Sequence, residues 1–144
     1  MKWLSIVRDN FKLRPFWMNG LLLFCAYMTF IYVPWDFLFK PVAEDQEVWF
    51  GILLTGWAAK ATEPLHWAIY AAGTVGFWKM RPWMHPWAAV YTLQVAIGMF
   101  VWAMLDERSP GWPAGVVAAI PFLILAAALL RSRARFTGTE PGHA

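Results

Sequence analysis

Four long stretches without a charged residue constrain the fold of this chain more than any other feature of its sequence. They cover residues 15–35, 64–78, 86–105 and 109–130. A helix needs about 20 apolar residues to cross the hydrocarbon core of a bilayer. Three stretches reach that length unaided. The second reaches it when the helix is extended to residues 61–80, which places Glu63 and Lys79 at its ends, where side chains can reach the membrane surface.

The composition agrees with a membrane protein. Hydrophobic residues make up 60% of the chain and charged residues 15%, against about 45–50% and about 25% in an average soluble domain. A single cysteine, Cys25, excludes an internal disulfide framework, and three scattered histidines cannot form a Cys/His zinc site. We therefore expect no cofactor and no metal site.

The positive charges predict the orientation of the helices. Nine of the twelve Lys and Arg residues lie within residues 2–14, 79–81 and 131–135, which fall on one side of a four-span arrangement. The positive-inside rule then predicts four crossings with both termini in the cytoplasm, and we expect the bacterial inner membrane. Because the basic charge is divided among three groups, no surface for nucleic acid is expected.

The predicted fold is a single all-α domain, an integral membrane four-helix bundle. Its expected spans are residues 15–35, 61–80, 86–105 and 110–130. Residues 48–59 (VWFGILLTGWAA) are uncharged but too few to cross, so they predict a short interfacial helix in the external loop between the first and second spans. The Gly- and Pro-containing end, residues 137–144, is expected to be a disordered tail.

The second span carries a polar face. Its members follow one another at intervals of three, four and four residues, which places them on one side of a helix: Glu63, His66, Tyr70 and Thr74. A polar stripe about three turns long is unfavourable against lipid, so we expect it to face the bundle interior or a water-filled recess. Asp36, at the end of the first span, lies on the same side of the membrane as Glu63.

These residues are candidates for a site. Asp36, Glu63 and His66 are the predicted acid–base residues, because carboxyl and imidazole groups beside apolar walls can exchange protons. The residues expected to contact a ligand are Tyr70, Thr74, Tyr91, Gln94, Trp67, Trp102 and Asp106. Each also has a structural explanation: acids at span ends stop the helix, and Gln94 is typical of a hydrogen bond between helices.

Such a site suits a hydrophobic ligand with one polar end, either a membrane lipid or a hydrophobic small molecule. Whether the protein is an enzyme or a binding protein stays open at this point. One alternative is a non-catalytic accessory subunit of a larger membrane complex, and a second is a small oligomeric channel or transporter. A homo-oligomer is compatible with each of these functions.

The pattern resembles the emopamil-binding group, the EXPERA-domain superfamily that includes sterol isomerases. The shared features are four helices with cytoplasmic ends, an acid near the end of the first helix, Asp36, and another at the second, Glu63. Residues 86–94 (PWAAVYTLQ) are similar to that family's third helix, in which a polar residue follows a tyrosine. The resemblance implies a double-bond isomerase or a binding protein for sterol-like lipids.

A second resemblance is to the lycopene-cyclase-type membrane domain, which carries a Pro-Trp-Asp motif followed by Pro-x-Glu-Glu. The chain has PWD at residues 34–36 and EPLH at residues 63–66, so that Glu63 precedes the proline and His66 occupies the position of an acid. This resemblance implies a cyclase. Both families rearrange carbon–carbon double bonds of isoprenoids, and together they imply an isoprenoid- or sterol-like ligand.

Overall fold

Seven α-helices and one β-hairpin make up the part of the chain that the computed structural model describes, residues 2–105 and 109–138. The helices are α1 Lys2–Phe11, α2 Phe16–Tyr27, α3 Val33–Phe39, α4 Trp57–Trp78, α5 Met84–Leu105, α6 Trp112–Arg131 and α7 Arg133–Thr137. The other elements are a π-helix η1 Met28–Tyr32, a 3-10 turn η2 Val42–Glu44, and strands β1 Gln46–Trp49 and β2 Ile52–Thr55.

Three helices are long and apolar enough to cross a membrane. They are Phe16–Phe39, which joins α2, η1 and α3, then Met84–Leu105 and Trp112–Arg131. These helices coincide with three of the four predicted spans within a few residues. The remaining predicted span, residues 61–80, corresponds to α4, which is helical but falls outside this set and carries Lys60 and Glu63 in its first turns. The helices identify a membrane protein, and the crossing by α4 is a proposal taken up below.

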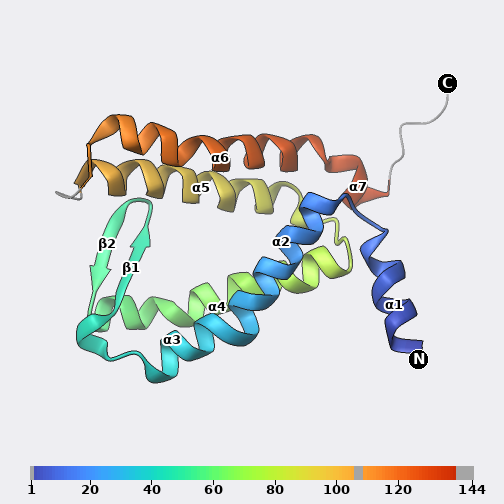
Figure 1. Ribbon diagram of the computed structural model, residues 1–144, viewed down its shortest axis with the longest axis horizontal. Helices are drawn as coiled ribbons and strands as arrows, with labels where there is room; N and C mark the ends of the chain where they lie inside the picture. Colours follow the sequence, from blue (N-terminus) through green and yellow to red (C-terminus); the bar gives the residue numbers. More distant parts are fainter. Residues whose placement is uncertain (1, 106–108, 139–144) are drawn as a thin grey trace.

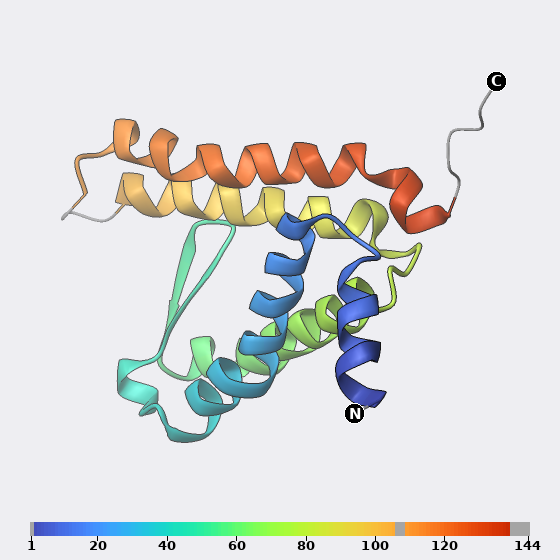
Figure 2. The same ribbon diagram turned by 45° about the vertical axis from the view of Figure 1, so that its right-hand side comes forward.

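The helices form two layers that are joined at both ends (Figures 1 and 2). One layer is the antiparallel pair α5 and α6, and the other contains α2, α3 and α4. The first layer is tight because small residues face the contact: a Cβ atom on Gly115 would lie 2.9 Å from the carbonyl oxygen of Phe100. At one end the chain passes between layers through residues 79–83, and at the other the β-hairpin reaches across to α5 (Figure 1).

The π-helix in the first membrane helix has a local cause. The first amide of α3 donates to the carbonyl of Met28, five residues back, and Pro34 has no N–H to donate. The carbonyl of Thr29 therefore lacks both of its usual helical donors. The indole Nε1 of Trp67 on α4 donates to this carbonyl at 2.8 Å. This bond attaches α4 to the irregular turn of the first helix.

The predicted interfacial helix over residues 48–59 is wrong. Most of this segment belongs to an antiparallel hairpin in which Trp49 pairs with Ile52, and α4 begins only at Trp57. The strands are rich in β-branched and aromatic residues, which fit a pleated ribbon. Phe50 and Gly51 both have positive φ, 51° and 84°, as a tight two-residue hairpin turn requires. This apolar segment has no helical period, and most of it therefore folds as strands.

Replacing Gly51 with Ala is expected to loosen the hairpin from α5. An added Cβ atom would lie 2.1 Å from the Cβ of Val101, and φ at this position is +84°. Overpacking and an unfavourable backbone conformation together should cost about 1–3 kcal/mol of unfolding free energy. Unfolding in detergent micelles, followed by tryptophan fluorescence, measures the loss, and Val101→Gly in the same chain, which removes the clashing Cβ atom, should restore part of it.

Gly20→Ala is the matched control, because a Cβ atom on Gly20 in α2 meets nothing within 4 Å. Alanine at an open helical position should be neutral or should stabilise by about 0.5–1 kcal/mol. Equal effects of the two glycine substitutions would contradict the contact between the hairpin turn and α5.

The two ends of the chain are helical as far as they are described. The lead before the first membrane helix forms α1, and its Asn10 donates to the carbonyl of Trp78 at the end of α4. Of the predicted tail, Thr137 is the last residue of α7, Gly138 follows it with a left-handed backbone conformation, and residues 139–144 lie outside the described residues.

Candidate functional site

The polar face of α4 looks toward the other elements. Glu63 is 1% exposed, and Nδ1 of His66 lies 2.7 Å from Oε2 of Glu47 on β1. One and two turns further along, the hydroxyl of Tyr91 on α5 donates to that of Tyr70 at 3.5 Å, and Thr74 lies 3.2 Å from Thr29 on the first membrane helix, hydroxyl to hydroxyl. These contacts agree with the expected inward orientation of the stripe.

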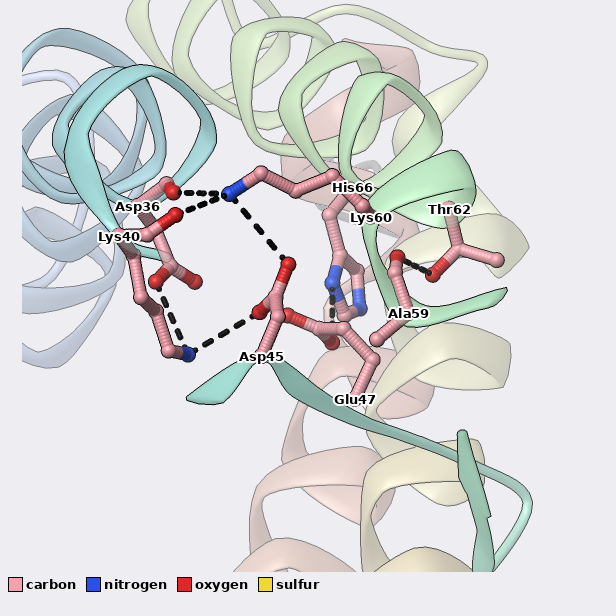
Figure 3. A network of polar contacts seen from close by, with 8 residues as sticks. All are labelled: Asp36, Lys40, Asp45, Glu47, Ala59, Lys60, Thr62 and His66. Atoms are coloured by element: carbon pink, nitrogen blue, oxygen red, sulfur yellow. Dashed lines mark hydrogen bonds and ion pairs between the residues drawn. The ribbon is translucent and has the colours of Figure 1, made fainter. Parts of the chain in front are cut away.

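Ion pairs surround the start of this stripe (Figure 3). The ammonium group of Lys40 lies 3.0 Å from Asp36 and 3.1 Å from Asp45, and that of Lys60 lies 3.4 Å from Asp45. Lys60 also donates to the backbone carbonyls of Asp36 and Lys40. Asp36 and Asp45 are almost completely buried. The network therefore ties the end of α3, the start of β1 and the first turn of α4 to one another.

The environment of Lys40 favours its charged form. Burial by itself lowers the pKa of the ammonium group, but hydrogen bonds to Asp36 and Asp45 outweigh it and raise the pKa above its ordinary value. A raised pKa in the folded state means that the stability from Lys40 is fully present below the pKa of an unfolded lysine. It is lost only as pH rises through the raised value.

His66 is held between a carboxylate and an aromatic ring. Its Nδ1 contacts Glu47, and the ring of Trp49 stacks on the imidazole with centroids 4.2 Å apart and planes 23° from parallel. The centroid of the Tyr70 ring lies 6.0 Å from that of the imidazole. Because Glu47 and Trp49 are two residues apart on β1, their side chains share one face of the strand. The hairpin thus fixes the orientation of the histidine.

We use the name polar cluster for the charged residues and the histidine gathered here: Asp36, Lys40, Asp45, Glu47, Lys60, Glu63 and His66. Within it, carboxylate oxygens of Asp36, Glu47 and Glu63 lie within 4.8 Å of one another. This is the one set of residues in the described part of the chain with a geometry suited to a metal ion. The sequence had led us to expect no such site.

A large apolar cavity, which we call the chamber, lies between the two layers. Its volume is about 870 Å³, and its walls come from α2, α4, α5, α6 and the tip of the hairpin. Most of the lining is aliphatic and aromatic, and Tyr70, Tyr91 and Gln94 are among the lining residues that carry polar groups. Trp49, whose ring stacks on His66, also lines the chamber. The polar cluster therefore adjoins the chamber through Trp49 and Tyr70.

The other predicted ligand-contacting residues lie elsewhere. Thr74 and Trp67 both bond to Thr29, where they join α4 to the first membrane helix. Trp102 is half-buried near the end of α5 and is not among the residues that line the chamber. Asp106 lies outside the described residues. Of the predicted set, Tyr70, Tyr91 and Gln94 are brought to the chamber, and Asp36, Glu63 and His66 to the polar cluster.

Sequence reasoning missed four of the seven residues of the polar cluster. Lys40, Asp45, Glu47 and Lys60 had been counted only as loop charges that help to orient the helices. One signal was available: Lys40 follows Asp36 by four residues, the spacing of an ion pair on a helix. The alignment of Glu47 with Trp49 became visible only once residues 46–49 were known to form a strand.

Comparison with known proteins adds no assignment. No family model, no curated protein and no solved structure matches this chain. The resemblances to the EXPERA-domain superfamily and to the lycopene-cyclase-type domain therefore stay predictions.

Proposed function

We propose that this protein binds an isoprenoid- or sterol-like lipid in the chamber between its two helical layers. The observation that carries the proposal is the chamber itself, whose volume of about 870 Å³ lies within the range of about 300–1,000 Å³ typical of small-molecule sites. Its walls are apolar apart from a few side chains that include Tyr70, Tyr91 and Gln94. A long hydrocarbon body with one polar end matches this distribution.

We also propose that α4 is a fourth crossing, which completes a four-helix membrane bundle with both termini in the cytoplasm of a bacterial cell. Three features support this crossing. The 22 residues of α4 cover about 33 Å as a helix, it runs back beside the first membrane helix (Figures 1 and 2), and Lys60 and Glu63, its charged residues, are buried. Charges shielded in this way need not contact lipid.

The polar end of the ligand would lie near Tyr70 and Tyr91. Their hydroxyl groups are 3.5 Å apart, and both residues line the chamber. A hydroxyl pair in an apolar wall can bind one alcohol or carbonyl group of a ligand and fix its orientation. Gln94, 8% exposed and one helical turn along α5, offers both a donor and an acceptor. These three residues are therefore the proposed polar contacts.

Isomerase or cyclase chemistry is the second candidate, and one observation favours it. Glu47 holds His66 at Nδ1, which leaves Nε2 as the basic atom of the neutral ring. The histidine ring lies 6.0 Å from that of Tyr70, a residue of the chamber wall. Asp36, Glu63 and His66 do not themselves line the chamber as described. Binding is thus the better supported function.

Ala72→Phe is expected to displace the ligand. Ala72 on α4 lines the chamber and is exposed to it, so a phenyl ring there can occupy the cavity without entering the packed core. An overpacking cost of about 1–3 kcal/mol within the occupied chamber corresponds to a loss of affinity of about 5- to 150-fold. Lipid extraction and mass spectrometry of the protein purified in mild detergent measure the amount of isoprenoid per chain.

The control is Val117→Phe, which adds the same ring to an exposed position on α6 that does not line the chamber. This variant should retain the wild-type amount of isoprenoid. Bulk phospholipid alone in the wild type would contradict the proposal. If the wild type carried only bulk phospholipid and partner chains were purified together with it, the accessory-subunit function would replace lipid binding as the proposal.

A further inference from the structure

We infer that Asp36, Glu47 and Glu63 hold a hard divalent cation in the polar cluster. The first argument is the charge balance. Four carboxylates lie together here, and they are opposed by the ammonium groups of Lys40 and Lys60. The ammonium group of Lys40 pairs with Asp36 and Asp45, and that of Lys60 pairs with Asp45. His66 contacts Glu47, so the buried Glu63 is the carboxylate that has no basic partner among the described residues. A divalent cation removes the excess of negative charge, whose burial is otherwise unfavourable.

Glu63 provides the second, independent argument. The residue is 1% exposed, and its Oε1 atom is buried without a hydrogen-bond partner among the described residues. No Lys, Arg or His forms an ion pair with it in residues 2–105 and 109–138. A buried carboxylate oxygen without a partner is rare in folded proteins and calls for an ion, a proton or a water molecule. Its position beside Asp36 and Glu47 points to an ion that all three share.

The geometry suits one ion. The candidate ligand oxygens lie within 4.8 Å of one another, and two oxygens across a cation with bonds of about 2.1–2.6 Å are roughly 4–5 Å apart. The three carboxylates come from α3, β1 and α4, so the ion would join the same elements as the ion pairs do. Nδ1 of His66, 2.7 Å from Glu47, would hold that ligand in place, as outer partners of metal ligands do.

The ligand type identifies the class of metal. Three carboxylates with no thiolate or thioether select Mg²⁺, Mn²⁺ or Ca²⁺ rather than copper or a structural zinc ion. This inference uses only the polar cluster and does not depend on what the chamber binds. An empty chamber would leave the metal site intact, and a metal-free cluster would leave lipid binding intact.

Manganese is the probe that tests the site. Protein purified in detergent, stripped with EDTA and desalted, is titrated with MnCl₂ while the six-line signal of free Mn²⁺ is followed by electron paramagnetic resonance. The wild type should bind about one ion per chain. Glu63→Gln, which keeps the shape of the side chain, should weaken binding about 100-fold or more, because even the loss of an outer partner costs about 10–100-fold.

Glu44→Gln is the matched control, because Glu44 is an exposed carboxylate in the same loop and is not in the polar cluster. It should bind as the wild type does. Glu47→Gln, at a half-buried position on β1, provides a second test should Glu63→Gln fail to fold. Wild-type protein that binds no Mn²⁺ would overturn the inference, since protons would then neutralise the carboxylates. Equal binding by wild type and the Glu47→Gln or folded Glu63→Gln variant would also overturn it.

Discussion

Asp45→Asn is expected to lower the free energy of unfolding by about 3–5 kcal/mol, the usual cost of removing one partner from a buried ion pair. The side chain of Asp45 is completely buried between Lys40 and Lys60, at 3.1 Å and 3.4 Å. An amide in its place keeps the shape but leaves two ammonium groups facing each other with one carboxylate fewer. Their repulsion should separate β1 from α3 and α4, and unfolding in detergent micelles followed by tryptophan fluorescence measures the loss.

Glu44→Ala is the control for Asp45→Asn, because it removes an exposed carboxylate from the adjacent position. A change at such a surface position should stay within about 0.5 kcal/mol. Removing Lys60 as well should reverse part of the loss in a double-mutant cycle, since it takes away one of the two opposed cations. If Asp45→Asn were as mild as Glu44→Ala, the ion-pair network would not be what holds these elements together.

Arg14→Ala is expected to cost about 3–5 kcal/mol as well, since hydrogen bonds from a charged donor contribute about 1.5–3 kcal/mol each. Arg14 is 4% exposed. Its guanidinium group donates to the carbonyl of Phe77 at 2.7 Å, to Asn19 at 2.7 Å, and to the side chain of Asn10. It therefore caps the C-terminal end of α4, where the helix dipole also favours a positive charge. The same fluorescence assay measures the change.

Two variants separate the stabilising cap that Arg14 forms from a general effect of positive charge near the membrane. Arg8→Ala removes a positive charge from the same N-terminal lead, but Arg8 is exposed, and its one ion pair with the described residues is to Asp9, at 3.8 Å. It should change stability by less than about 0.5 kcal/mol. Arg14→Lys keeps the charge but cannot match the fork of donors, so it should restore less than half of the loss. Equal losses for Arg8→Ala and Arg14→Ala would show that charge near the membrane, and not the cap, is what matters.

The membrane helices were predictable because crossing a bilayer is a one-dimensional requirement. A run of about 20 apolar residues satisfies it whatever its neighbours are, and three of the predicted spans agree with the observed candidate helices. The polar stripe from Glu63 to Thr74 was predictable for a similar reason, since the helical period decides which residues share a face. The side of the membrane on which the termini lie stays a prediction from the positive charges.

The β-hairpin was missed because a short apolar segment has no unambiguous period. Residues 48–59 were read as a helix that lies on the membrane surface, but Val48 and Gly51 instead approach Gly98 and Val101 of α5. That contact lies about fifty residues away in the sequence, and it stabilises a strand conformation that local preferences alone leave open. A prediction from spacing had no means of detecting it.

The linear order of apolar and charged residues was enough to predict a helical membrane protein with an inward polar stripe, because helix period and bilayer thickness act along one chain segment at a time. Long-range contacts decided which charges are structural and which line a site. Arg14 and Asp45 looked like surface charges but are buried partners of distant groups, and Glu47 joins Asp36 and Glu63 only because the hairpin carries it there. Burial changes the energy of a charge far more than its neighbours in sequence do, and burial is a property of the folded chain.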